Sequence, residues 1–180
     1  MGSREDAISL YLLQVEENGI SASTYSNLED SQKAMLEVGR GGRHFLKREH
    51  RKKFKVAMTG GVFDVIHIGH IDTLTRAKEN ADILIAVVAQ DSHIHNKSRT
   101  PLHTQEYRQV LVQALKPVDL AILGGENAEE TLERVHPDAI VYGYDQKPFL
   151  KPEGVEIIGL KSKIDPKNVK TSTILEKLGI

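Results

Sequence analysis

The 180-residue sequence has no cysteine, no tryptophan and no long hydrophobic run. The absence of cysteine excludes disulfide bonds and thiolate metal ligands, and it is consistent with a cytoplasmic protein. No apolar segment approaches the roughly 20 residues that a membrane-spanning helix needs, and the N-terminus lacks the hydrophobic segment of a signal peptide. We therefore expect a cytoplasmic chain without a membrane partner.

The sequence also has almost no net charge, because 24 Lys and Arg are balanced by 25 Asp and Glu to give −1. This balance argues against a surface that is basic throughout, so nucleic acid is not an expected partner. The low aromatic content of 5% fits an aliphatic α/β core. The length suffices for one well-buried domain and a small appendage.

Residues 1–52 do not follow the pattern of the rest of the chain and form the appendage. A short helix is expected from Ala7 to Val15, and a second one carrying residues 34–36. Residues 38–46 contain a glycine turn that predicts a small hairpin. The segment is either a helical appendage or part of a winged-helix-like module. The seven Lys and Arg between residues 43 and 55 are typical of a solvated linker, with attraction of an anionic substrate or weak nucleic-acid contact as the alternatives.

Residues 53–180 alternate between aliphatic runs and helical patterns. Strands are expected at residues 54–59, 82–89, 118–123, 139–142 and 155–159, and helices at 69–80, 104–114, 128–135 and 172–178. In the second helix, Tyr107, Val110, Leu111 and Ala114 are expected to face inward. Strands separated by helices predict a doubly wound parallel α/β sheet, with its ligand site outside the carboxyl ends of the strands.

The segment from Lys53 to Leu74, KFKVAMTGGVFDVIHIGHIDTL, organises this domain. A buried strand ends at Gly60-Gly61, where a ligand can approach the backbone closely. A helix then begins near Gly69, and its N-terminus presents free N–H groups to a phosphate. His67 and His70 add donors that can stabilise charge developing on a phosphoryl group. Asp64 is expected to orient the loop, with action on a metal ion through water as the alternative.

This motif, Gly-Gly-x-Phe-Asp-x-x-His-x-Gly-His, resembles the signature of the nucleotidyltransferase superfamily that includes the cytidylyltransferases. The resemblance covers most of residues 54–180 and is greatest to archaeal-type FAD synthase. It implies a Rossmann-like, five-stranded sheet with strand order 3-2-1-4-5. It also implies a homodimer and a Mg²⁺ ion, or another divalent cation, held mainly by the triphosphate rather than by protein ligands.

The resemblance assigns candidate site residues along the chain. Two histidines and a cation would be catalytic: His67, His70 and Lys97. The nucleotide-binding candidates begin in the first loop with Gly61, Val62, Phe63, Ile68 and Gly69, together with the two histidines. Arg108 could neutralise phosphate, and Gly143 and Asp145 follow the fourth strand, where the family recognises the nucleotide. Ser172 and Thr173 fall where the family holds phosphates, although helix capping explains them equally well.

The implied reaction is an in-line attack of an acceptor oxygen on the α-phosphorus of a nucleoside triphosphate, which releases pyrophosphate. ATP with FMN is the preferred pair, and a wide apolar slot for the flavin is expected near Phe149, Leu150 and Ile158. CTP with glycerol 3-phosphate or a similar polyol phosphate, and adenylylation of a heptose phosphate, are the alternatives. Val62 and Ile68 stand where FAD synthases usually have threonine and proline. A non-enzymatic nucleotide-binding regulator is the remaining alternative.

Overall fold

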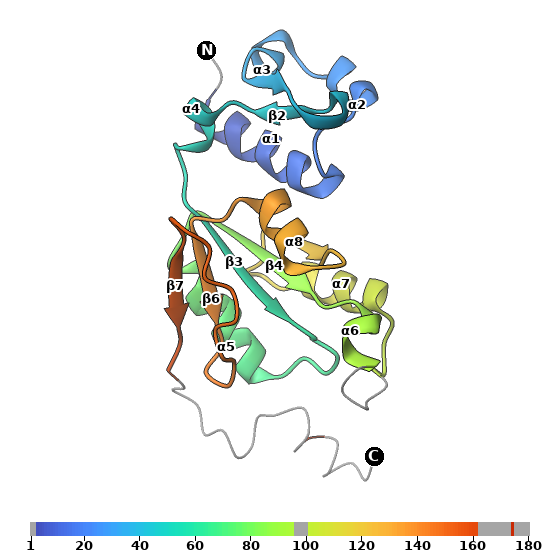
Figure 1. The fold of residues 1–180 in the computed structure, drawn as a ribbon, viewed down its shortest axis with the longest axis vertical. Coiled ribbons are helices and arrows are strands. Elements are labelled where there is room, and N and C mark those ends of the chain that lie inside the picture. Colours follow the sequence, from blue (N-terminus) through green and yellow to red (C-terminus); the bar gives the residue numbers. More distant parts are fainter. Residues whose placement is uncertain (1–2, 96–100, 162–173, 175–180) are drawn as a thin grey trace. The chain divides into compact units, whose positions relative to one another are not determined.

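The computed structural model describes residues 3–95, 101–161 and 174, and the chain forms two compact units, Met1–Lys55 and Val56–Ile180 (Figure 1). Within the described residues, no helix combines the length and the apolar character that crossing a membrane requires. The predicted C-terminal helix lies outside the described residues except for Ile174.

The N-terminal unit combines short helices with an antiparallel hairpin. Ile20 adds an isolated bridge to His44 on the hairpin, and Gln14 accepts a hydrogen bond from the Leu46 N–H at 2.7 Å. Tyr11 packs on Phe54 with ring centroids 5.3 Å apart. The elements are α1 (Arg4–Glu17), α2 (Ala22–Ser26), α3 (Asp30–Lys33), β1 (Leu36–Val38), a 3₁₀ turn (Arg40–Gly42), β2 (His44–Leu46) and α4 (Arg48–Arg51). The relation to a winged-helix module stays a prediction.

Three predictions for this region are wrong in detail. Met35 and Leu36 are not helical, because α3 ends at Lys33 and Leu36 begins the hairpin. Phe54 does not start the first strand of the sheet but packs within the N-terminal unit. The basic run is not a solvated linker, since it forms β2 and α4 and its cations bind carbonyl groups: Arg43 donates to Gly19, Lys47 to Ala34 and Arg51 to Phe54.

The second unit is a parallel five-stranded sheet of order β5-β4-β3-β6-β7, so the predicted doubly wound order is confirmed (Figure 1). The order reverses between β3 and β6, which creates the crevice expected at a switch point. Its elements are β3 (Val56–Gly61), α5 (Ile68–Lys78), β4 (Ile83–Val88), α6 (Asp91–His95), α7 (Gln105–Gln113), β5 (Leu120–Leu123), α8 (Ala128–Val135), β6 (Ala139–Tyr142) and β7 (Glu156–Gly159).

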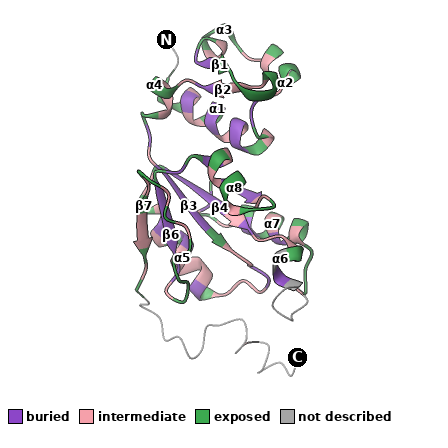
Figure 2. Cartoon of the chain, in the orientation of Figure 1, coloured by how far each residue is buried: buried purple, intermediate pink, exposed green. Residues whose placement is uncertain are grey.

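The two faces of this sheet are covered differently, as the alternation of side chains along each strand shows. On one face, buried strand residues such as Ala57 and Ala86 pack against Leu74 of α5 and Val112 of α7. On the other face, the adjacent strand residues turn toward α8 and line an open pocket instead. Figure 2 shows buried residues along β3, β4 and β6 in the middle of the sheet.

The prediction for the inner face of α7 is wrong. Tyr107, Val110, Leu111 and Ala114 are exposed, whereas Arg108 and Val112 are fully buried. The helix adopts this rotation because the Arg108 guanidinium finds protein acceptors for four hydrogen bonds inside the domain. A buried arginine is tolerated when its donors are paired in this way.

Candidate active site

The loop after β3 is built on close packing around two glycines. The strand continues through Gly60 and Gly61, and neither has a positive φ. Phe63 takes φ +55° instead, a region that bulky residues rarely occupy. A Cβ on Gly61 would lie 2.9 Å from the buried Phe63 ring. Glycine is therefore required at residue 61 by space rather than by backbone conformation.

The two loop histidines form a stacked pair at the N-terminus of α5. Their ring centroids are 3.9 Å apart, and His67 is the N-cap residue. The His67 backbone N–H donates to Nδ1 of His70 at 3.4 Å, a long bond that leaves the hydrogen of His70 on Nε2. Nδ1 of His67 is buried and has no hydrogen-bond partner among the described residues. The described part of the chain therefore leaves one polar atom of the stacked pair unsatisfied.

Burial keeps both imidazoles neutral at physiological pH. Desolvation lowers the pKa of His70 to about 4, with a further lowering from His67 and an opposing effect from Asp145. Desolvation also lowers the pKa of His67, again opposed by Asp145. A neutral imidazole with a fixed tautomer donates one hydrogen bond in a defined direction. Such a donor suits the stabilisation of a phosphoryl oxygen.

A pocket of about 310 Å³ brings this loop together with the predicted nucleotide motif after β6. Gly143 lies close to α5, since a Cβ there would be 3.3 Å from Oγ1 of Thr73. The pocket is lined by Thr59, Gly60, Gly61, Val62, Phe63, His67, Gly69, His70, Thr73, Gly143, Tyr144, Asp145 and Gln146. We call it the histidine pocket.

Most predicted site residues that the structure describes line the histidine pocket. Ile68 does not; it is 53% exposed on the first turn of α5. Arg108 does not either, because it is buried behind the loop. Lys97, Ser172 and Thr173 lie outside the described residues, so their roles stay predictions.

Arg108 supports the loop from behind. Its guanidinium donates to the carbonyl groups of Val62, Ala89 and His103 and to the Asp91 carboxylate at 2.6 Å. These bonds join the loop after β3 to the end of β4 and the start of α7. The geometry gives Arg108 a positioning role in place of the predicted phosphate contact.

Asp64 has the loop-orienting geometry that we expected. Its carboxylate is buried and accepts the backbone N–H groups of Leu102 at 2.9 Å and His103 at 3.1 Å. These bonds connect the loop after β3 to the segment that precedes α7. Asp64 itself is not among the residues that line the histidine pocket.

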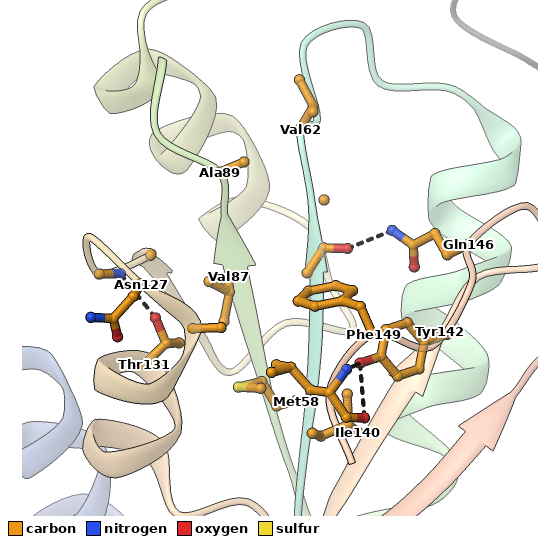
Figure 3. Close-up of a pocket in the computed structure, with 16 residues that line it drawn as sticks. Met58, Val62, Val87, Ala89, Asn127, Thr131, Ile140, Tyr142, Gln146 and Phe149 are labelled. Carbon is orange, nitrogen blue, oxygen red and sulfur yellow. Dashed lines mark hydrogen bonds between the residues drawn. The ribbon is translucent and has the colours of Figure 1, made fainter. Parts of the chain in front are cut away.

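A second pocket, of about 440 Å³, lies on the α8 face of the sheet (Figure 3). Figure 3 shows Tyr142, Phe149 and Gln146 on one side and Val87, Asn127 and Thr131 on the other. Most of its wall is apolar, from Met58, Val62, Val87, Ala89, Ala128, Ile140, Tyr142, Phe149 and Leu150; Gly60, Gly61, Gly124, Gly125, Asn127, Thr131 and Gln146 complete the lining. We call it the apolar pocket.

Phe149 and Leu150 line the apolar pocket as expected for a wide apolar slot, whereas Ile158 packs against the core. Phe149 stands edge-on to Tyr142, with ring centroids 5.8 Å apart, and is 77% exposed. The Tyr142 hydroxyl accepts the Leu150 N–H at 3.1 Å and so holds this segment over the sheet.

The sequence analysis did not predict the part of the apolar pocket that lies between the sheet and α8. Met58, Val87, Ile140 and Tyr142 alternate with the residues that face α5 and α7, and the pocket that they line is bordered by the eight-residue helix α8. Comparing the number of helices expected on each face could have indicated an uncovered apolar surface. Asn127 and Thr131 carry no recognisable motif.

The two pockets lie on opposite faces of the sheet and meet at the end of β3. They share Gly60, Gly61, Val62 and Gln146. A doubly wound sheet with paired neutral histidines at its switch point defines a nucleotide-binding protein suited to phosphoryl-group chemistry. The shared edge connects the two pockets at the end of β3.

Comparison with known proteins agrees with this class. Residues 58–177 match the family described as cytidylyltransferase-like. The chain belongs to this family of nucleotidyltransferases, which favours an enzyme over the regulator alternative. A FAD synthase of Thermococcus kodakarensis is 36% identical over 142 residues, covering 72% of this chain and 95% of the relative. A FAD synthase of Ferroglobus placidus is 34% identical over 134 residues, covering 69% and 88%.

A solved structure shares the fold as well. The protein from Thermoplasma volcanium described as a lipopolysaccharide core biosynthesis protein is 37% identical, with a TM-score of 0.56. The similarity covers 62% of this chain and 99% of that chain.

Proposed function

We propose that this protein transfers the AMP group of ATP to FMN, forming FAD and pyrophosphate. An oxygen of the FMN phosphate attacks the α-phosphorus of ATP, and the bond from that phosphorus to the bridging oxygen of pyrophosphate breaks. Each ligand would occupy one pocket, so that the phosphates meet at Gly60–Val62. The names of the two FAD synthase relatives support the same pair of substrates.

The histidine pocket is the proposed site of the triphosphate. His67 and His70 would donate hydrogen bonds to phosphate oxygens, and the N-terminus of α5 adds its free N–H groups. Asp145 and Gly143 would contact the nucleoside, as the family motif suggests. Neutral histidines suit donation that follows the developing charge without requiring a proton transfer.

The described residues contain no group of three or more His, Asp or Glu that could hold a metal ion. The carboxylate that lines the histidine pocket is Asp145. This donor set fits a divalent cation whose ligands are mainly phosphate oxygens and water. When bound, such an ion neutralises charge on the triphosphate. We expect the enzyme to act as a homodimer.

The observation that carries the choice of FMN is the apolar lining of the second pocket. A polyol or sugar phosphate would need several hydrogen-bonding groups there, since its hydroxyls lose water on binding. A flavin offers a broad ring system that can pack on Met58, Ile140 and Phe149. The volume of about 440 Å³ is within the range of ligand pockets.

Titration of FMN by flavin fluorescence, together with calorimetry of ATP and CTP, tests the assignment. We expect FMN to bind and ATP to bind more tightly than CTP. Phe149→Ala should weaken FMN binding about tenfold because it removes an aromatic contact, and should leave ATP affinity unchanged. Tyr107→Ala is the matched control, since Tyr107 is 66% exposed and lines neither pocket. Tighter binding of CTP with no binding of FMN would instead favour cytidylyl transfer.

A further inference from the structure

The carboxyl ends of β3 and β6 separate at the switch point. Their ladder pairs Ala57 with Ala139 and Met58 with Ile140, whereas β3 continues beside β4 as far as Gly61. Beyond Met58 the two strands are connected by side chains instead. The first connection is Thr59, whose Oγ1 donates to the Val141 carbonyl at 2.8 Å.

The second connection is Gln146, which spans the crevice. Its Nε2 donates to the Gly60 carbonyl at 2.8 Å (Figure 3). Its Oε1 accepts the Gly143 N–H, also at 2.8 Å. The two bonds define the orientation of the amide, because the reversed amide would place oxygen against oxygen and N–H against N–H. One side chain thus fixes the end of β3 relative to the start of the nucleotide motif.

The position of Gln146 relative to the pockets indicates its function. The histidine pocket and the apolar pocket share the three consecutive residues Gly60–Val62, and from elsewhere in the described chain they share Gln146. We propose that Gln146 is a positioning residue, which holds the two strand ends so that the acceptor phosphate meets the α-phosphorus in line. This inference rests on the proposed assignment of one substrate to each pocket.

The physical reason is the short range of in-line displacement. The attacking oxygen must come within roughly 3–3.5 Å of the phosphorus with the leaving oxygen opposite, and small misplacements greatly slow the reaction. Each substrate is bound mainly by its own pocket, on its own face of the sheet. Loss of the Gln146 bonds should therefore lower turnover without much change in the affinity for either substrate.

The test compares Gln146→Met, which keeps length but removes both hydrogen bonds, with Lys147→Met, its exposed neighbour that lines neither pocket. We expect kcat to fall by about 30-fold or more in Gln146→Met. Dissociation constants for FMN and for a non-hydrolysable ATP analogue, measured separately, should change less than about threefold. A kcat equal to that of wild type would overturn the proposal. So would a loss of activity that is explained entirely by weaker binding of both ligands and a lower Tm.

Gln146→Glu provides a second readout that does not depend on folding of the first variant. A carboxylate can still accept the Gly143 N–H but cannot donate to Gly60, whereas the protonated carboxyl can do both. The ratio of variant to wild-type kcat should thus rise at least about fivefold between pH 8 and pH 5, where Glu begins to protonate. A flat ratio contradicts the positioning role.

The wild-type chain separates this proposal from the choice of FMN. If it makes no FAD, the FMN assignment fails. The Gln146 variants are then measured with the substrate pair from which the wild-type chain does release pyrophosphate, either CTP with glycerol 3-phosphate or ATP with a sugar phosphate. Pyrophosphate release from no pair would reject both proposals. Activity with FMN that is insensitive to Gln146 would reject only the positioning role.

Discussion

At the scale of single residues, the site depends on two imidazoles, those of His67 and His70, that burial keeps in the neutral form. The His70 side chain is a neutral donor because desolvation opposes its charged form. Asp145 acts in the opposite direction on both rings but does not outweigh burial. The same carboxylate lines the pocket, so it can contact a ligand while it tunes the histidines.

The lowered pKa of His70 predicts how stability changes with pH. Its pKa is about 4 in the folded chain and 6.5 in the unfolded chain, so the unfolded state binds more protons between these values. The His70 contribution to the free energy of unfolding should be constant above pH 6.5 and should decrease as the pH falls toward 4. Urea unfolding of wild type and His70→Asn from pH 4 to pH 8 measures it.

The difference between the two chains isolates His70 from the carboxylates that titrate in the same range. We expect wild type to lose more stability than His70→Asn on acidification. Parallel curves for the two chains would mean that His70 is not desolvated in the folded state.

At the scale of elements, the end of β3 lies between the two pockets and carries two residues without side chains, Gly60 and Gly61. A Cβ on Gly60 would point toward the apolar pocket and make ordinary contacts, 3.7 Å from the Val87 carbonyl oxygen. A Cβ on Gly61 would point the other way and collide with the Phe63 ring. The two adjacent glycines therefore serve different faces of the sheet.

This difference predicts opposite outcomes for two one-methyl changes. Gly60→Ala should keep the wild-type Tm and raise the KM for FMN about tenfold with little change for ATP, since the methyl group occupies the acceptor side. Gly61→Ala should lower stability by about 1–3 kcal/mol through overpacking against Phe63. Steady-state kinetics and thermal unfolding of the pair check this. A Gly60→Ala chain with unchanged KM for FMN would contradict the pocket assignment.

The elements also show what the sequence could and could not predict. The alternation of strands and helices and the His67–His70 loop follow from local patterns, whereas the strand order follows from the family resemblance; the structure agrees with all three. The inner face of α7 could not be predicted, because an analysis of hydrophobic periodicity treats arginine as a solvent-facing residue and so does not identify a buried one. The hydrogen-bond acceptors of Arg108 are spread along the sequence, with Val62 the first and His103 the last. Only the folded chain brings them together.

Arg108 is accordingly predicted to be a stability determinant. Arg108→Met leaves three carbonyl groups and the Asp91 carboxylate without this donor, and it should lower the free energy of unfolding by about 3 kcal/mol. Tyr107→Met, on the exposed side of the same helix, should change it by less than about 0.5 kcal/mol. Urea unfolding of both variants measures the difference. Equal effects of the two substitutions would show that the Arg108 bonds contribute little.

At the scale of the whole molecule, the chemistry resides in the second unit. The family match falls within it, and both pockets are lined by its residues alone. In the N-terminal unit, several basic side chains are engaged with carbonyl groups of the unit itself. Neither this engagement nor the net charge of −1 indicates a nucleic-acid-binding surface.

The account as a whole makes one claim that a single assay can test: the two pockets combine ATP with FMN. The purified protein, incubated with Mg²⁺, ATP and FMN, should form FAD and an equal amount of pyrophosphate. Chromatography measures the FAD, and a pyrophosphate assay measures the second product. His70→Ala should reduce kcat by about 10²-fold, because one preorganised donor is lost, whereas His50→Ala in the N-terminal unit should not. Formation of CDP-glycerol from CTP and glycerol 3-phosphate, with no FAD from ATP and FMN, would contradict the account.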